Sequence, residues 1–378
     1  MASIEMIPKM KTRVLTVMAT RDEDQALVMA TADKHAITSV DEKQWSAEEC
    51  IVPCFGWHPW FAHTKYLDPA QSQEPSQERL TGEAKVKHYQ SVLVPCRETL
   101  SDEHRQIFLS LPDPASFARF LVETRSHLER YPYALIGEIG LDRSFRIPES
   151  WVHNQNLWAQ RDDRLTPGGR EGRPLTPFRC SLDHQKKICR MQLQLAAEMG
   201  RAVSVHGVQA HGAVFEVLQE LWKGHEKDLV SSKRERKKRA HHHPPAIHVD
   251  HVPETSHTNR RPMPYPPRIC LHSYSGNASN LKQYLNPVIP TKIFASFSTA
   301  INLSDVINGE IPRSFQDVVQ TVPDDRLLVE SDLHTAGEEL DKRIEDITRK
   351  ICTIKGWSLE KGCQQLRQNW RAFALGQT

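Results

Sequence analysis

Four short apolar segments of this 378-residue chain carry an acidic or histidine side chain at or near their C-terminal ends. The side chains are Glu138, His206, His272 and Asp332, in segments 134–142, 202–207, 269–276 and 327–332. A charged or imidazole group in an apolar strand is costly unless a partner such as a metal ion offsets its desolvation. Carboxylate and imidazole ligands suit divalent cations that activate water. The pattern therefore predicts a divalent-metal hydrolase.

Each position also has a plainer interpretation. Glu138 lies between Gly137 and Gly140, and its two oxygens can each take a cation, but it could also be a buried carboxylate paired with an arginine. A single strand-end histidine such as His206 or His272 is often a structural core residue. The Ser-Tyr-Ser-Gly turn after His272 is expected to bring backbone donors near the site. The coincidence of the four positions favours the metal site.

These side chains meet only if their segments are parallel strands of one sheet. In a parallel α/β barrel the C-terminal strand ends carry the chemistry, and strand-like segments here alternate with helix-like ones, as in βα units. The predicted strands are residues 14–20, 51–56, 134–142, 201–207, 269–274, 292–298 and 326–332. The predicted helices are residues 115–130, 182–199, 338–354 and 358–375, the last with Ser358 as its N-cap. The predicted fold class is α/β, a TIM-type (β/α) barrel. Since it needs eight strands and seven are counted, the first strand is expected to be lacking.

Two long loop insertions interrupt this pattern. We interpret residues 1–378 as a single barrel, with one insertion at 144–177 that is rich in Arg, Pro and Gly. The second, at 223–268, is basic, rich in Pro and His, and predicted to be disordered. Its run Lys-Arg-Glu-Arg-Lys-Lys-Arg at 233–239 is interpreted as a solvated linker, with nuclear import or nucleic-acid contact as the alternatives.

The amino-acid composition argues against several classes of protein. The chain has 49 Lys+Arg against 47 Asp+Glu, so its surface as a whole lacks the excess of positive charge that binds polyanions such as nucleic acid. No apolar segment approaches the ~20 residues that span a bilayer, so no membrane association is expected. Eight cysteines without a Cys-x-x-Cys pair indicate reduced thiols. We expect a cytoplasmic or nuclear location, or both.

Six motifs together resemble the TatD family of metal-dependent deoxyribonucleases. They are Gly-Trp-His-Pro at 56–59, Gly-Glu-Ile-Gly-Leu-Asp at 137–142, Val-His at 205–206, His-Ser-Tyr-Ser-Gly at 272–276, Glu-Ser-Asp at 330–332 and Asn-Trp-Arg-Ala-Phe at 369–373. Their order and placement match along nearly the whole chain, and the insertions resemble those of a fungal branch. The resemblance implies an amidohydrolase-type TIM barrel with one or two ions at the strand ends.

The resemblance also implies roles for individual residues. Glu138 would bridge two cations, His206 and His272 would bind metal, and Asp332 would bind the first metal and handle the attacking water. His58 would face the substrate phosphate, although a capping or packing histidine in a Pro-stiffened loop is the alternative. Supporting hydrogen bonds are expected from Asp142 and Glu330. The metal would be Mg2+ or Mn2+, with Zn2+ possible, and the substrate DNA.

The chain departs from the family at its start, because the Asp-x-His-x-His strand of the TatD pattern is missing. The strand count points to the same gap. Either the natural protein begins upstream and includes that strand, which we favour because the other ligands are intact, or the shorter chain is catalytically impaired.

Three functions are therefore compared. The first is a metal-dependent deoxyribonuclease. The second is a non-catalytic interaction protein that binds partners, such as cell-division machinery, through its inserted loops. The third is another amidohydrolase, such as a deaminase or lactonase. Many of those enzymes have a modified lysine where this chain has Glu138, so the carboxylate favours the first function over the third.

Overall fold

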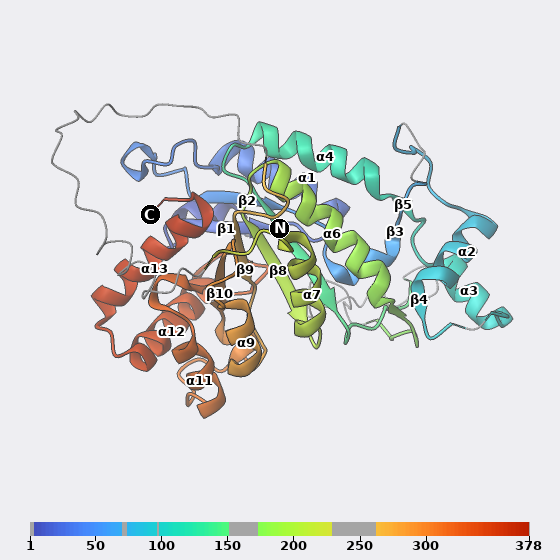
Figure 1. Cartoon of the computed structure of the whole chain (residues 1–378). Coiled ribbons are helices and arrows are strands. Elements are labelled where there is room, and N and C mark those ends of the chain that lie inside the picture. The colour runs from blue at the N-terminus through green and yellow to red at the C-terminus, as the bar shows by residue number, and fades with distance from the viewer. Residues whose placement is uncertain (1–3, 70–73, 97, 151–172, 229–261, 378) are drawn as a thin grey trace, which may run out of the picture.

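The core of the molecule is a curved sheet of seven parallel strands. The computed structural model describes residues 4–69, 74–96, 98–150, 173–228 and 262–377 (Figure 1). The sheet order is β1-β2-β6-β8-β9-β10-β11, and every neighbouring pair is parallel. The strands are β1 (Leu15–Met18), β2 (Ile51–Phe55), β6 (Leu135–Asp142), β8 (Val203–Val208), β9 (Arg268–Leu271), β10 (Lys292–Phe297) and β11 (Leu327–Val329). All seven predicted strands are confirmed.

Two of these strands end three residues earlier than the sequence predicts, the largest differences at the C-terminal ends. The strand predicted to reach residue 274 ends at Leu271, and the one predicted to reach residue 332 ends at Val329. Ser273 and Asp332 have φ angles of 36° and 54°, in the left-handed region, which extended backbone does not enter. The chain therefore turns out of the sheet at the residues that carry the polar side chains.

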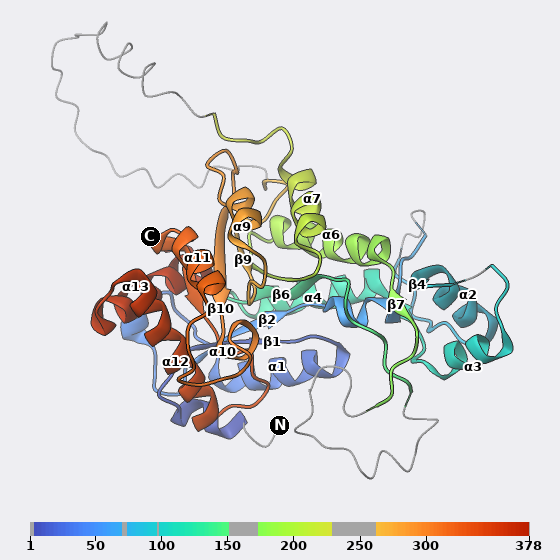
Figure 2. The same cartoon turned by 90° about the horizontal axis from the view of Figure 1, so that it is seen from below.

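Helices lie against the outside of the curved sheet (Figures 1 and 2). The four predicted helices are confirmed as α4 (Phe117–Arg130), α6 (Leu182–Glu198), α12 (Glu338–Lys355) and α13 (Leu359–Ala374). The Ser358 side chain caps α13 by accepting a hydrogen bond from the backbone N–H of Lys361. The others on the sheet are α1 (Asp22–His35), α7 (His211–Trp222), α9 (Ala278–Tyr284) and α11 (Arg313–Thr321). Helix α1 was not predicted because the residues that it buries include Gln25 and Thr31, which blur the apolar period.

The sheet is a half-barrel, because β1 and β11 are its end strands and no ladder joins them in the described part of the chain. The N-terminal segment lies along this side. The backbone N–H groups of Lys11 and Thr12 donate to the Asp341 carboxylate of α12 at 2.8 and 2.9 Å. In the preceding 3-10 helix η1 (Ile4–Lys9), Ile7 packs in one cluster with Ile51 of β2. The TIM-type fold lacking one strand is thus confirmed.

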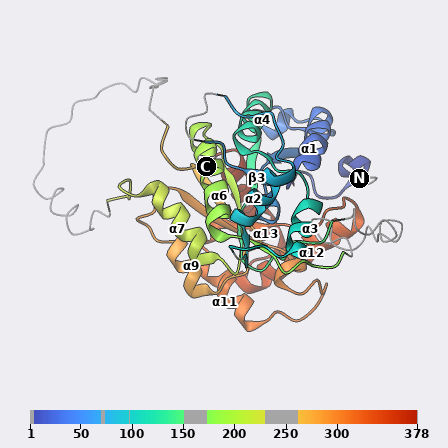
Figure 3. The ribbon, with the colours of Figure 1, turned by 90° about the vertical axis from the view of Figure 1, so that its right-hand side faces the viewer.

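A small unit that the sequence did not predict projects from the barrel. We call residues 65–116 the arm; it contains α2 (Gly82–Val92) and α3 (Asp102–Ser110), which lie nearest the viewer in Figure 3. Its own apolar cluster includes Tyr89 and Phe108. The short ladder of β3 (Lys65–Tyr66) with β5 (Ala115–Ser116) joins the two ends of the arm, and the ladder of β4 (Leu93–Val94) with β7 (Arg179–Cys180) ties the arm to the segment before α6. The arm therefore lies beside the N-terminal ends of α4 and α6.

The predicted insertions are described only at their ends. In the 144–177 insertion, Ile147 joins the apolar cluster of the arm and Pro148 forms an antiparallel bridge with Leu175. Residues 151–172 and 229–261, which include the predicted basic run at 233–239, lie outside the described residues. Within the described part of the chain, no helix has the length and apolar character to cross a membrane.

Candidate metal centre

The seven polar residues singled out in the sequence meet at one edge of the sheet. Glu138 and Asp142 belong to β6 and His206 to β8, while the other four follow the last residues of β2, β9 and β11. Strands β6 and β8 are adjacent, with Gly140 opposite His206. A Cβ at Gly140 would lie 2.1 Å from the carbonyl oxygen of His206, and the φ angle there is 143°, so only glycine allows this approach. The parallel sheet thus brings carboxylates and imidazoles together from distant parts of the sequence.

Glu138 is the centre of the cluster. Its Oε1 lies 2.8 Å from His206 Nδ1, 3.6 Å from His58 Nε2 and 3.7 Å from His272 Nε2. Burial by itself would raise the pKa of this carboxyl, but the positive charge of His272 and the hydrogen bond from His206 hold it well below its usual range. Glu138 is therefore a buried carboxylate among three imidazoles.

His206 lies between two carboxylates. Its Nδ1 is 2.8 Å from Glu138 Oε1, and its Nε2 is 3.1 Å from Asp142 Oδ2. Because a carboxylate only accepts, both ring nitrogens must donate, so the ring is the imidazolium form. Burial alone would lower the pKa of His206, but the hydrogen bonds to Asp142 and Glu138 raise it to about 9. Either ring nitrogen would become a metal ligand on losing its proton.

His272 repeats this arrangement on the other side of Glu138. Its Nδ1 is 3.0 Å from Glu330 Oε2, and its Nε2 is 3.3 Å from Asp332 Oδ1. Although burial lowers the pKa of this ring, the charges of Glu138, Glu330 and Asp332 raise it well above its usual value. The Ser273 hydroxyl donates to Glu330 Oε1 and lies 2.9 Å from the Ser298 hydroxyl oxygen. Glu330 is thus held at both carboxylate oxygens.

His58 begins a short 3-10 helix, η3 (Pro59–Thr64). Its Nδ1 accepts a hydrogen bond from the backbone N–H of Trp60 at 3.2 Å, which leaves Nε2 directed at Glu138. The imidazole is buried, with 3 % of its surface exposed. Burial lowers the pKa of His58 in spite of the nearby carboxylates. The residue therefore caps a helix and also contributes to the cluster.

Two residues at the site hold carboxylates in place, a role that was not predicted from the sequence. The indole N–H of Trp60 donates to Asp142 Oδ2 at 2.7 Å, and its ring stacks on Phe145 with centroids 4.8 Å apart. The Ser273 hydroxyl donates to Glu330 Oε1 and so holds that carboxylate in place. Of the backbone donors expected near the site after His272, those of residues 273 and 274 already have partners within the protein. Their N–H groups donate to Ser296 of β10, at 3.2 Å to its Oγ and 3.0 Å to its carbonyl oxygen.

The side chains form two groups that could each hold a metal ion. In His58, Glu138 and His206, and again in His272, Glu330 and Asp332, one ligand atom of each residue lies within 4.8 Å of the others. Among the described residues, the ion pairs of Glu138, Asp142, Glu330 and Asp332 are with histidines and with no Lys or Arg. The alternative of a buried Glu138 paired with an arginine is therefore wrong. Four carboxylates whose ion-pair partners among the described residues are all imidazoles fit one or two divalent cations.

Known proteins resemble this chain over most of its length. The family model described as TatD related DNase matches residues 8–374. The protein named Cut9-interacting protein scn1, from Schizosaccharomyces pombe, is 33 % identical over 98 % of this chain and 94 % of its own length. An uncharacterized deoxyribonuclease of Saccharomyces cerevisiae is 26 % identical over 74 % of this chain and 64 % of its own. A solved TatD homologue from Escherichia coli is 15 % identical, with a TM-score of 0.48 over 98 % of this chain and 90 % of that one.

The family model covers both the barrel and the carboxylate–imidazole cluster at its strand ends. The match to the relative from Schizosaccharomyces pombe runs over nearly the full length of both chains. This chain belongs to the TatD-related DNase family.

Proposed function

We propose that this chain is a divalent-metal-dependent hydrolase that cleaves phosphodiester bonds in DNA. The observation that carries the proposal is the position of the Glu138 carboxylate among three imidazoles, beside a second group of ligands. Membership of a family described as DNases supports DNA as the substrate. A relative described as an uncharacterized deoxyribonuclease supports the same class of reaction.

The two groups of ligands would hold one or two ions. His58, Glu138 and His206 would hold one, and His272, Glu330 and Asp332 the other, with Glu138 as the residue nearest to both. We favour His58 as a ligand over a contact to the substrate phosphate, because its ring is buried and faces Glu138. When bound, Mg2+, Mn2+ or Zn2+ would supply Lewis-acid chemistry, lowering the pKa of water and withdrawing charge from phosphate oxygens.

Asp332 is the residue best placed to move a proton. Its side chain is 28 % exposed, against 11 % for Glu138 and 15 % for Glu330, so it is the acidic group that a substrate and a water molecule reach first. A carboxylate at this position would accept the proton of the attacking water. Asp142 would act as a positioning residue, because Trp60 and His206 both hold its Oδ2 in place.

The experiment that tests this function is cleavage of end-labelled duplex DNA by the purified full chain after treatment with EDTA. We expect no cleavage without added ions, cleavage after addition of Mg2+, Mn2+ or Zn2+, and loss of that cleavage in Asp332→Asn. Asp317→Asn is a matched control, since Asp317 pairs with Arg313 on α11. Cleavage that is equally fast in Asp332→Asn and in the unmodified chain would contradict the proposal.

A second candidate function is binding of other proteins. The relative that is 33 % identical over nearly its whole length is named a Cut9-interacting protein. A pull-down from cell extract with the full chain, with Asp332→Asn, and with a chain lacking only residues 229–261 of the basic insertion, so that β9 is kept, tests this role. We expect a cell-division partner to be retained by Asp332→Asn and lost by the deletion. Retention of every partner by the deleted chain would contradict binding through this insertion.

A further inference from the structure

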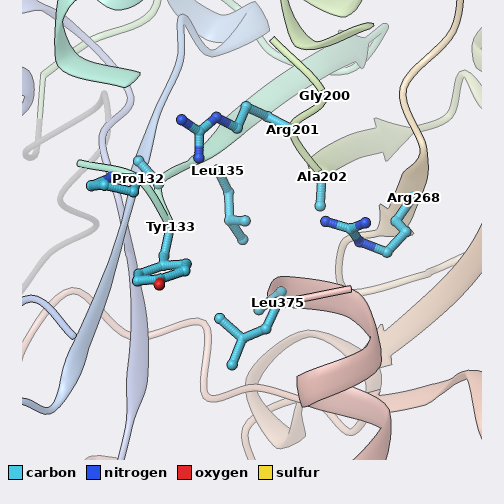
Figure 4. A pocket seen from close by; sticks show the side chains of 10 residues that line it. Pro132, Tyr133, Leu135, Gly200, Arg201, Ala202, Arg268 and Leu375 are labelled. Carbon is cyan, nitrogen blue, oxygen red and sulfur yellow. The ribbon is translucent and has the colours of Figure 1, made fainter. Parts of the chain in front are cut away.

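A second concentration of charge lies at the opposite end of the sheet, where the strands begin. Arg201 precedes β8 and Arg268 is the first residue of β9, which is the neighbouring strand. Both border a cavity of about 290 Å3, together with Pro132, Tyr133, Leu135 and Leu375. Figure 4 shows the two arginines on either side of the Leu135 side chain, with the Tyr133 ring and the Leu375 side chain lower in the view. We call this cavity the arginine pocket.

Each arginine has one structural contact. Arg201 Nη2 donates to the carbonyl oxygen of Leu128 at 2.7 Å, and Arg268 Nε donates to that of Phe373 at 2.6 Å. Leu128 and Phe373 lie in the last turns of α4 and α13, where the helix dipole is negative and carbonyl groups lack helical partners. These contacts orient the two side chains. Each occupies one of the five N–H donors of its guanidinium group, so further donors remain for a ligand.

In the part of the chain that the structure describes, no acidic side chain balances the two charges. In the described residues neither arginine has an ion pair with a carboxylate, and Arg201 Nε is buried without a hydrogen-bond partner. The two groups also act on each other: burial, and then the charge of Arg201, lower the pKa of Arg268. Two half-buried cations that share a cavity without a counter-charge destabilise the fold unless an anion binds between them.

We infer that the arginine pocket is a binding site for a phosphate group, either inorganic phosphate or the phosphate of a small phosphomonoester. A phosphomonoester carries about two negative charges at neutral pH, which matches two guanidinium groups, whereas a single carboxylate balances only one of them. Planar guanidinium forks bind phosphate oxygens in pairs. The cavity is larger than a phosphate group, and Tyr133 and Leu375 offer contacts to an organic substituent. This site is separate from the metal centre and does not depend on the proposed function.

The test is isothermal titration of the EDTA-treated full chain with inorganic phosphate, deoxyadenosine monophosphate and deoxyadenosine. We expect both phosphate-bearing compounds to bind and deoxyadenosine not to bind. Tighter binding of the monophosphate would identify phosphomonoesters as the ligand, and equal binding would identify inorganic phosphate. Arg201→Gln and Arg268→Gln should each weaken binding about tenfold or more, because each removes hydrogen bonds to a charged acceptor.

Two controls separate this pocket from other sites. Glu138→Gln changes the metal centre and should leave phosphate binding unchanged. Arg190→Gln removes an arginine of α6 that already pairs with Glu220, and should also have no effect. If the Gln variants do not fold, Arg201→Lys and Arg268→Lys keep the charge but lose the fork and should weaken binding several-fold. The inference is overturned by absence of binding up to ~10 mM, by Arg variants that bind like the unmodified chain, or by loss of binding in Glu138→Gln.

Discussion

Two groups of three buried histidines lie on either side of η3, and they differ in what surrounds them. At the start of this helix His58 faces Glu138, in the group with His206 and His272. Near its end His63 faces the arm, in a group with His88 of α2 and His184 of α6. The first group contacts four carboxylates. In the described residues the second contacts none.

We call His63, His88 and His184 the arm group. The rings of His88 and His184 form hydrogen bonds with backbone carbonyl oxygens. His88 Nε2 donates to the carbonyl oxygen of His63 at 2.8 Å, and His184 Nε2 donates to those of Ala62 and Lys65, each at 3.0 Å. Burial, with a smaller effect of neighbouring positive charge, lowers the pKa of His63 to about 3 and of His184 to about 4. Burial therefore makes a histidine a neutral packing residue, and neighbouring carboxylates make it a cation or a metal ligand.

The largest expected effect comes from removing the central carboxylate of the metal centre. Glu138→Gln leaves a side chain of the same shape that no longer carries a charge near His206 and His272. We expect DNA cleavage to fall about a thousandfold, because a lost metal site removes several kcal/mol of transition-state stabilisation. The measurement is the rate under saturating Mn2+, with Glu220→Gln on the exposed face of α7 as control. A decrease of less than tenfold would contradict the view that the Glu138 carboxylate is what makes the first group of histidines a metal site.

The arm group should make the protein sensitive to acid. The folded-state pKa values of His63 and His184 lie below the usual value of 6.5, so their neutral forms stabilise the fold above about pH 6.5, and this stabilisation is lost as the pH falls toward 4. At pH 5 each histidine should lower the free energy of unfolding by about 2 kcal/mol relative to pH 7.5. The groups that contribute to these shifts are His88, near both rings, and Lys187, near His184.

Chemical unfolding at both pH values measures this effect. His184→Gln keeps a donor for the carbonyl oxygens of Ala62 and Lys65 and should reduce the pH-dependent loss of stability by about 2 kcal/mol. The same substitution at His225 should leave the sensitivity unchanged, because that ring is exposed in the folded and in the unfolded chain. If His184→Gln were as acid-sensitive as the unmodified chain, burial of this ring would not be the cause.

Ions should stabilise the fold through the first group of histidines and not through the second. Adding Mn2+ to EDTA-treated protein at one hundred times its dissociation constant should raise the free energy of unfolding by about 3 kcal/mol. The expected cause is that cations replace protons between carboxylates that otherwise repel one another. Thermal unfolding with and without Mn2+ measures the shift. It should vanish in Glu138→Gln and persist in His184→Gln, and the opposite pattern would place the ion at the arm.

The smallest of these effects concerns Trp60, which lies on η3 between the two groups. Trp60→Phe keeps an aromatic ring that can stack on Phe145 but removes the hydrogen bond to Asp142. We expect kcat to fall about tenfold with little change in KM, because Asp142 holds His206 and does not contact substrate. Trp57→Phe removes an indole hydrogen bond to the carbonyl oxygen of Phe61 and serves as the control. Equal decreases in both variants would indicate a general loss of packing.

The metal centre was recognisable in the sequence because a polar residue in an apolar strand is locally anomalous. Glu138 and His206 each stand within β6 or β8 among buried apolar residues, and that signal needs no knowledge of the fold. Trp60 gave no such signal, because its hydrogen-bond partner Asp142 is 82 positions away. The arm was missed for the related reason that its two helices are short and bury their apolar faces mainly on each other.

The sequence by itself determined the seven strands, the four long helices and the identities of the polar residues at the strand ends. These follow from side-chain periodicity and from the cost of burying charge, both of which act over a few neighbouring residues. The tertiary structure alone decided which histidines receive carboxylate partners, and that Arg201 and Arg268 share a cavity whose described lining residues include no acid. A pKa depends on charges and solvent within several ångströms in space, and in a parallel sheet those neighbours come from residues far apart in the sequence.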